Sequence, residues 1–264
     1  MMIRYQGRAA SYGEVWYDER PPSADGVDIL VYRQQAAPIA NTRHTPFLSL
    51  VSDLCVDDQA IAAAFSKECR YEIRRAGAKD ALAMTQFSEA DGALAKFIAF
   101  YQDFAEQKSL APVDVQWLEA ACGTGRVLFT TAAQGGDTLV WHAYLLCART
   151  ARLMHSASLF RDHDPSFRAL VGRANRWLHW NDMLHLKSLG MATYDWGGMF
   201  EDETTPDRAG INRFKRSFGG RPVRSYDCTA ALSLKGRLYL PLRDAWRRRR
   251  TAAATPQEET CQPS

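Results

Sequence analysis

A lysine near the end of the chain is the residue best suited to do chemistry. It lies in a glycine-bounded segment, Gly-Ile-Asn-Arg-Phe-Lys-Arg-Ser-Phe-Gly-Gly, at residues 210–220. In a helix, Lys215 would stand at the edge of an apolar stripe made by Ile211, Phe214 and Phe218. A lysine at such an edge can extend into water. It can instead point into a cleft, where a fixed cation stabilises a carbonyl oxygen that becomes negative during acyl transfer.

Asp195 is the second candidate, at the end of a short predicted strand and just before Trp-Gly-Gly. Its carboxylate can cap the following turn by accepting hydrogen bonds from backbone N–H groups. It can also orient an attacking amine or take its proton, because an amine must be unprotonated to attack. Gly197 and Gly198 allow the backbone to approach a substrate or a neighbouring strand closely. The sequence leaves these alternatives open.

Two histidines, His142 and His155, lie on adjacent predicted strands and are further candidates for a base. Tyr144 shares a strand face with His142, so this pair could line a polar cleft. A half-buried histidine that simply hydrogen-bonds a neighbour is the commoner arrangement. We therefore rank both histidines below Asp195.

The sequence predicts no metal or redox centre. None of the six cysteines forms a Cys-x-x-Cys pair. His163 stands between two aspartates, but Asp164 is better placed to cap the helix that follows. His179 and His185 are six residues apart on one predicted helix, which is not the spacing of a metal-binding pair.

The first part of the chain is expected to form strands and then helices. Short β-branched runs predict strands at 27–32 and 47–51. From residue 57 onward apolar side chains recur every four positions, which predicts one helix over 57–77 with Gly77 at its end. A second apolar stripe predicts a helix over 94–104.

The middle of the chain is expected to be an antiparallel meander. Strands at 127–131 and 139–148 flank the hairpin signal Gly135-Gly136, and a third strand follows at 153–159. An Asp-Pro pair at 164–165 is a typical helix start. The expected order after the meander is a helix, a strand, a helix and a strand, at residues 165–190, 191–196, 206–218 and 223–226.

Composition predicts an ordinary globular chain. The 264 residues are 46% hydrophobic and 24% charged, and the net charge of +3 is too small to argue for nucleic acid. We expect a strand-rich segment at 1–58 packed on a main domain at 59–245, followed by a basic and then disordered tail at 246–264. The N-terminus lacks an apolar leader and no run is long enough to span a bilayer, so we expect a cytoplasmic protein.

Three segments resemble motifs of the Fem family of aminoacyltransferases, whose domains have a GNAT-type fold. Residues 71–76, Tyr-Glu-Ile-Arg-Arg-Ala, are similar to that family's Ile-Arg-Lys-Ala helix end. Residues 194–198, Tyr-Asp-Trp-Gly-Gly, are similar to its Tyr-Asp-Leu-Gly-Gly strand exit, and residues 210–220 to its Gly-x-x-x-Phe-Lys-x-x-Phe-Gly-Gly motif. The matches keep their order across residues 60–228. The bridge-forming members carry two GNAT-like domains, whereas this chain has room for one.

The resemblance implies a mixed α/β (α+β) fold of the GNAT type, with a mostly antiparallel central sheet flanked by helices. It implies an N-acyltransferase that forms an amide by moving an acyl or aminoacyl group onto an amine. The lysine matching Lys215 is considered catalytic in the family, Asp195 would position or deprotonate the acceptor, and Phe214 would pack beside the donor. The other substrate-binding residues expected are Arg74, His142, Tyr144, His155, Gly197, Gly198 and Arg213.

The donor is expected to be an aminoacyl-tRNA, bound by its acceptor end, with no tightly bound cofactor. GNAT enzymes that use coenzyme A hold its pyrophosphate on a Gln/Arg-x-x-Gly-x-Gly/Ala loop before a helix. The nearest stretch here, 168–174, has its arginine one residue too far from the glycine and falls inside a predicted helix. Arg74, Arg75, Arg173 and Arg176 could contact phosphate, although at least half of them are expected on the solvated surface.

Two other functions stay open at this stage. One is an acyl-CoA-dependent N-acyltransferase that acts on an amino sugar, an amino acid or a polysaccharide precursor. The other is a catalytically inactive GNAT-like domain used for binding or assembly, against which the position of Lys215 in the family motif argues. The sequence names neither the amine acceptor nor the oligomeric state.

Overall fold

The computed structural model describes residues 1–17, 23–88, 92–108, 110–158 and 164–253. Its strands are β1 (Ile3–Gln6), β2 (Ser11–Trp16), β3 (Ile29–Gln35), β4 (Arg43–Asp53), β5 (Ala83–Phe87), β6 (Val127–Gln134), β7 (Asp137–Cys147), β8 (Thr150–Ser158), β9 (Thr193–Gly198) and β10 (Arg221–Ala231). Its helices are α1 (Asp58–Ala63), α2 (Lys67–Lys79), α3 (Ala93–Gln107), α4 (Val115–Cys122), α5 (Pro165–Ser188), α6 (Pro206–Arg216) and α7 (Leu234–Ala253).

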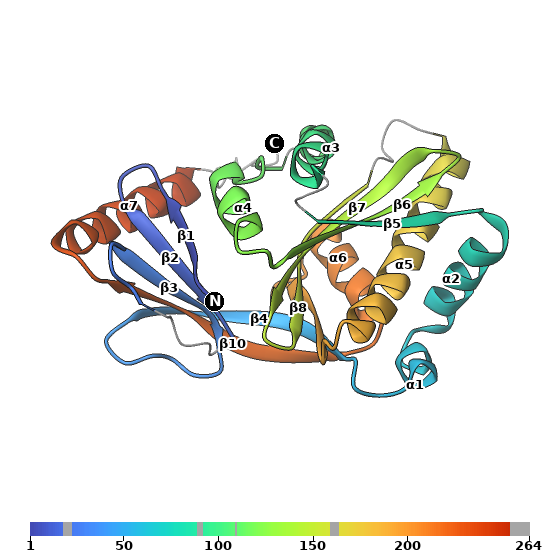
Figure 1. Cartoon of the computed structure of the whole chain (residues 1–264), viewed down its shortest axis with the longest axis horizontal. Helices are drawn as coiled ribbons and strands as arrows, with labels where there is room; N and C mark the ends of the chain where they lie inside the picture. Colours follow the sequence, from blue (N-terminus) through green and yellow to red (C-terminus); the bar gives the residue numbers. More distant parts are fainter. Residues whose placement is uncertain (18–22, 89–91, 109, 159–163, 254–264) are drawn as a thin grey trace, which may run out of the picture.

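One ten-stranded sheet connects the two ends of the molecule, in the order β1-β2-β3-β10-β4-β9-β8-β7-β6-β5. The pairs β2–β3 and β8–β9 are parallel, and the other pairs are antiparallel. Helix α5 packs on β6 and β7 with α2 beside it, α3 and α4 lie over the sheet between its two halves, and α7 lies at the far end near β1 to β3 (Figure 1). The predicted mixed fold with a mostly antiparallel sheet is confirmed.

The predicted meander and long helix are confirmed in detail. β6, β7 and β8 pair antiparallel in sequence order, and the turn between the first two places Gly135 and Gly136 at φ 60° and 98°. Such positive φ values favour glycine because it has no Cβ. Asp164 caps α5, where its Oδ1 accepts hydrogen bonds from the N–H groups of Ser166 (2.7 Å) and Phe167 (3.2 Å).

The single helix predicted over 57–77 is wrong, because two helices occupy this segment. Ser66 separates α1 from α2, and its hydroxyl caps α2 by accepting a hydrogen bond from Cys69 N at 3.1 Å. The four-residue apolar spacing runs through both helices because their buried residues face the same core. Gly77 lies inside α2, and Asp80 forms its C-cap.

Five elements were not anticipated: β1, β2, β5, α4 and α7. The last of these carries the backbone through the basic run to Ala253, and residues 254–264 of the predicted tail lie outside the described residues. Asp162 and His163 also lie outside them. None of the helices in the described part of the chain combines the length and apolar character needed to cross a bilayer.

Candidate active site

The strands β8 and β9 are joined for only a short distance and then separate. Their pairing covers residues 150–152 and 193–195, although both strands continue beyond it. Arg152 and Asp195 form the last pair. Past this point the two strands no longer share a ladder, so a substrate can enter the space between them.

A cavity of about 740 Å³ opens at this split. Residues of α3, β8, α5, β9 and α6 form its wall. Its size suits a small molecule or the reactive end of a larger one, since ligand cavities measure roughly 300–1,000 Å³. The described part of the wall contains one acidic residue, Asp207, and five lysine or arginine residues. The five are Lys108, Arg152, Arg168, Arg176 and Lys215.

Lys215 is held in this wall by a hydrogen bond from its Nζ to the carbonyl oxygen of Gly198 at 2.6 Å. Burial lowers the pKa of Lys215 to about 8, and the charge of Arg152 adds to the effect while Asp195 opposes it. The side chain is therefore still mostly cationic at neutral pH. Its helix is anchored by Asn212, whose side chain bonds the backbone N and O of Phe200 at 3.1 and 2.8 Å.

Asp195 lies behind the cavity wall with 1% of its surface exposed. Its Oδ1 accepts hydrogen bonds from Arg152 Nη1 (3.2 Å) and Gly197 N (2.7 Å). Its Oδ2 accepts from Tyr17 Oη (2.9 Å) and Gln34 Nε2 (2.7 Å). Two carboxylate oxygens offer about four acceptor positions, and all are used. The hydrogen bond from Gly197 N shows the capping role, one of the two that the sequence allowed for Asp195. Asp195 does not line the cavity, which differs from the contact with an acceptor amine that the other role requires.

Two of these donors have unusual backbones. Tyr17 and Gln34 adopt left-handed conformations, at φ 53° and 51°. This conformation costs a residue with a Cβ about 1–2 kcal/mol, and such strain tends to collect at functional sites. Both strained residues direct their side chains to the same oxygen of Asp195. The N-terminal strands β2 and β3 therefore help to build the site.

Arg152 brings a buried positive charge to the point where β8 and β9 separate. The residue is 8% exposed, and its guanidinium lies 5.8 Å from the ring centre of Trp16 and 5.4 Å from that of Phe47. Gly197 next to it has φ +79°, and a Cβ at that position would lie 2.5 Å from Arg152 Nη1. Both observations favour glycine at this position. We call Tyr17, Gln34, Arg152 and Asp195 the apex cluster.

Several other predicted site residues do line the cavity. Phe214 is half-buried, and the guanidinium of Arg176 lies 5.0 Å from its ring centre. His155 packs its ring 5.0 Å from that of Tyr101, and burial followed by the charge of Arg152 lowers its pKa to about 4, so it is neutral. The predicted residues in the wall are His155, Gly197, Gly198, Phe214 and Lys215.

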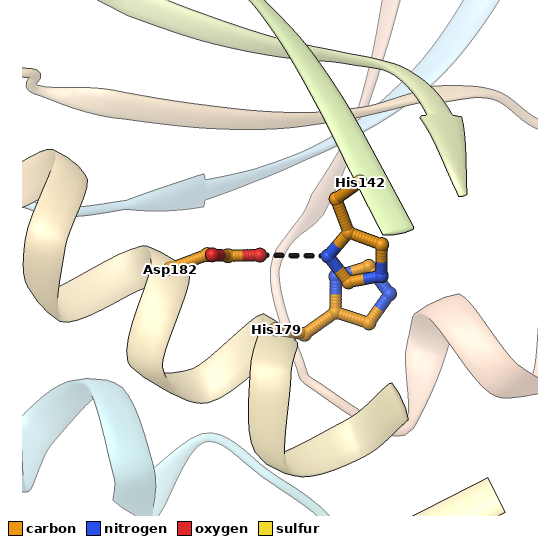
Figure 2. A group of neighbouring side chains, drawn as sticks. All are labelled: His142, His179 and Asp182. Carbon is orange, nitrogen blue, oxygen red and sulfur yellow. Dashed lines mark hydrogen bonds and ion pairs between the residues drawn. The ribbon is translucent and has the colours of Figure 1, made fainter. Parts of the chain in front are cut away.

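His142 and Tyr144 are fully buried and lie behind the cavity wall. This position differs from the substrate contacts that we expected for them. His142 Nδ1 lies 2.7 Å from Asp182 Oδ2, and its ring stacks on that of His179 with centres 4.0 Å apart (Figure 2). The side chains of His142, His179 and Asp182 are close enough together to be considered as metal ligands. However, the two rings are inclined by only 26°, and lone pairs in stacked planes do not converge on one ion.

The predicted arginines have mixed positions. Arg74 and Arg213 are exposed and do not line the cavity, which differs from the substrate contacts expected for them. Arg173 is buried and forms a two-point ion pair with Asp80, at 2.6 and 3.0 Å. Among the arginines considered for phosphate, Arg176 is the one in the cavity wall.

Four residues at the site were not among the predicted site residues: Arg152, His179, Tyr17 and Gln34. Arg152 carries a weak signal, because a charged residue between Ala151 and Leu153 in a strand needs a partner if it is buried. His179 lies beside the apolar stripe of α5 and gives only a weak signal. Tyr17 and Gln34 give none, because their partner is 178 and 161 residues away in the chain.

Known proteins resemble this chain in structure but not in sequence. No protein-family model matches the sequence, and no curated protein matches it. The structure of FemX is similar over 74% of this chain and 63% of its own, with a TM-score of 0.58 and 12% identity. The C-terminal domain (DUF2156) of a putative lysylphosphatidylglycerol synthetase from Agrobacterium fabrum is similar over 93% of this chain and 84% of its own, with a TM-score of 0.56 and 13% identity. The fold of this chain is therefore similar to that of FemX and of this C-terminal domain.

The chain spans less than two thirds of FemX. In this Fem-like fold the cavity, Lys215 and the apex cluster all lie at the split between β8 and β9.

Proposed function

We propose that this protein is an N-acyltransferase, which joins an acyl or aminoacyl group to an amine inside the cavity. The observation that carries the proposal is the position of Lys215 at the split, where Gly198 O holds its ammonium group 2.6 Å away. A cation fixed before the reaction needs no reorganisation when negative charge develops nearby. The Fem-like fold supports the same class of reaction.

Lys215 would stabilise the carbonyl oxygen of the donor as the amine attacks. The attack forms a C–N bond and moves the carbonyl π electrons onto the oxygen, which becomes anionic. Lys215 is largely buried, and charge interactions are stronger there than in bulk water. Arg152 adds a second positive charge at the apex of the cavity.

We favour an aminoacyl-tRNA as the donor. Coenzyme A pyrophosphate would require free N–H groups at a helix N-terminus near the split. At the start of α5, Asp164 already accepts hydrogen bonds from Ser166 N and Phe167 N, and Pro165 has no N–H. Hydrogen bonds from Ser166 and from these N–H groups lower the pKa of Asp164, so a negative charge occupies this helix end.

The names of the two similar structures support an aminoacyl group as the part transferred. One is FemX, and the other is named for the synthesis of an aminoacylated lipid. The basic wall residues suit the phosphates at the end of a tRNA. They suit the phosphates of an acyl-CoA as well, so that donor is the second arm of the test.

The test is incubation of the protein with charged tRNA, with acyl-CoA, and with a panel of amines, followed by mass spectrometry of the products. We expect an amide product with a charged tRNA. Lys215→Met keeps the side-chain length without the charge and should lower the rate about 100–1,000-fold. Lys79→Met is the matched control, because Lys79 is exposed on α2 and does not line the cavity.

Three outcomes would count against the proposal or its parts. If a product forms only with acyl-CoA, the donor is acyl-CoA and the proposal of an aminoacyl-tRNA donor is wrong. A Lys215→Met protein that folds normally and keeps the wild-type rate would remove the proposed role of Lys215. No product from either donor pool would favour a non-catalytic domain.

A further inference from the structure

A chain of hydrogen bonds leads from the cavity wall into the buried interior behind it. His179 lines the cavity, and its Nδ1 lies 2.7 Å from Tyr194 Oη. Tyr194 Oη lies 2.8 Å from Tyr144 Oη, which donates to Asp182 Oδ2 at 2.6 Å. His142 Nδ1 contacts the same carboxylate oxygen at 2.7 Å. We call these five residues the relay cluster; each is at most 1% exposed.

With Asp182 as a carboxylate, counting hydrogens fixes the direction of the bonds through the two tyrosines. A tyrosine hydroxyl has one hydrogen, and Tyr144 gives its hydrogen to Asp182. Tyr194 must therefore donate to Tyr144, and its oxygen is left as an acceptor for His179. It follows that His179 carries its proton on Nδ1 and has a lone pair on Nε2. Burial, and after it the charges of His142, Lys215 and Arg176, lowers the pKa of His179 well below its usual value, so the ring is neutral.

The residues at the two ends of the chain each have one nitrogen or oxygen atom without a hydrogen bond to a described residue. Nε2 of His179 makes no hydrogen bond to a described residue, although the ring is part of the cavity wall. At the other end, Asp182 Oδ1 is buried and has no hydrogen-bond partner among the described residues. Buried acceptors without a partner are rare in proteins and call for a functional explanation.

We propose that His179 is the general base of this acyl transfer and that Tyr194 and Tyr144 pass the proton on to Asp182. This inference rests on the function proposed above. The acceptor enters as an ammonium ion and gives one proton to His179 Nε2. The Nδ1 proton of His179 moves to Tyr194, the proton of Tyr194 moves to Tyr144, and the proton of Tyr144 moves to Asp182 Oδ2.

The rest of the reaction balances as follows. The neutral amine forms the new C–N bond with its lone pair, while the bond between the acyl carbon and the leaving oxygen or sulfur breaks. The leaving group takes the second amine proton. The first returns from Asp182 along the same hydrogen bonds to His179 and leaves from its Nε2 to solvent in the cavity, which restores the Nδ1–H form. A buried carboxylate at the end of the relay explains how a neutral, desolvated His179 can take a proton beside two basic side chains, because the charge does not stay on the ring.

The experiment combines a proton readout with a rate readout. Nitrogen-15 NMR of histidine-labelled wild-type protein reports which ring nitrogen of His179 carries the proton, and the missing signal in His179→Gln assigns it. We expect the Nδ1–H form, and we expect Tyr194→Phe to disturb it. The rate arm uses the donor and acceptor found above: kcat should fall about 100-fold in His179→Gln and about tenfold in Tyr194→Phe, with little change in KM for the donor. His185→Gln on the same helix is the control, expected to keep the wild-type kcat.

The outcomes separate this inference from the function on which it rests. An Nε2–H tautomer in the wild type overturns the relay, whatever the activity. So does a kcat for Tyr194→Phe within about twofold of wild type in a protein that loses its activity with Lys215→Met. Inactivity of the wild type with every donor contradicts the proposed function instead. The Nδ1–H tautomer together with the two rate losses supports the relay.

Discussion

Two buried carboxylates lie behind the cavity, and they differ in how their oxygens are used. Asp195, in the apex cluster, accepts four hydrogen bonds and has no free position. Asp182, in the relay cluster, accepts on Oδ2 and leaves Oδ1 without a partner among the described residues. Asp195, with every acceptor position used, holds the groups around it in place, whereas Asp182 is bonded through Oδ2 alone, the oxygen that receives the proton in the proposed relay. Two aspartates behind one cavity thus have different roles: Asp195 holds neighbouring side chains in place, and Asp182 is the proton acceptor of the proposed relay.

The largest effect should come from breaking the saturated cluster. Asp195→Ala would leave Arg152 as a buried charge without its partner, which should lower the free energy of unfolding by about 3–5 kcal/mol. Urea denaturation at fixed pH measures this. Asp202→Ala is the control, since Asp202 forms an exposed pair with Arg208 and should cost at most about 1 kcal/mol. Equal losses in the two variants would show that the apex cluster does not stabilise the site.

The charge of Lys215 should set the alkaline limit of activity. Its pKa is lowered to about 8, so the cation is present below that pH and is lost as the pH rises through it. We expect kcat to fall about tenfold per pH unit above the pKa. Lys215→Arg should remove this fall, because a guanidinium stays charged throughout the range. A wild-type profile that stays flat well above pH 8 would contradict the role of the cation.

A smaller loss should follow from crowding the apex. Gly197→Ala adds a Cβ 2.5 Å from Arg152 Nη1 at a backbone φ of +79°. We expect the free energy of unfolding to fall by about 1–3 kcal/mol and the rate to fall with it. Gly77→Ala in α2 is the matched change, because its nearest neighbour is an ordinary 3.5 Å from the added carbon. That variant should be as stable as the wild type or slightly more so.

The smallest effect is expected outside both clusters. Arg74 is exposed on α2 and does not line the cavity. Arg74→Ala should change the free energy of unfolding by less than about 0.5 kcal/mol and leave kcat/KM unchanged. A clear rise in KM for the donor would instead show that Arg74 contacts the donor and that the binding site extends beyond the cavity.

Local signals in the sequence predicted a large part of the fold. The Asp-Pro start of α5 and the Gly135-Gly136 turn act over a few residues, and both are present as predicted. The break at Ser66 was missed because the apolar spacing continues across it. Helix α7 was missed because it contains Pro241, a residue that normally ends a helix, and because its leucines lie on different faces, with Leu240 buried and Leu234 77% exposed.

The site was predictable only where a motif marked it. Lys215 and Gly197 belong to segments that resemble known motifs, and both are at the cavity. Arg152 meets Asp195 across 43 residues of chain, and His179 meets Tyr194 across a strand–helix boundary. Pairs of this kind depend on how strands are registered, and no short stretch of sequence records that.

The short joint between β8 and β9 also has a mechanical consequence. Three paired positions join these strands, and outside the joint β9 is supported by β4 and β8 by β7. Behind the joint, Tyr144 of β7 and Tyr194 of β9 belong to one buried core and are hydrogen-bonded through their hydroxyl groups at 2.8 Å. The core therefore holds the two strands at a set separation, and this separation limits the bulk of the acceptor that the cavity admits.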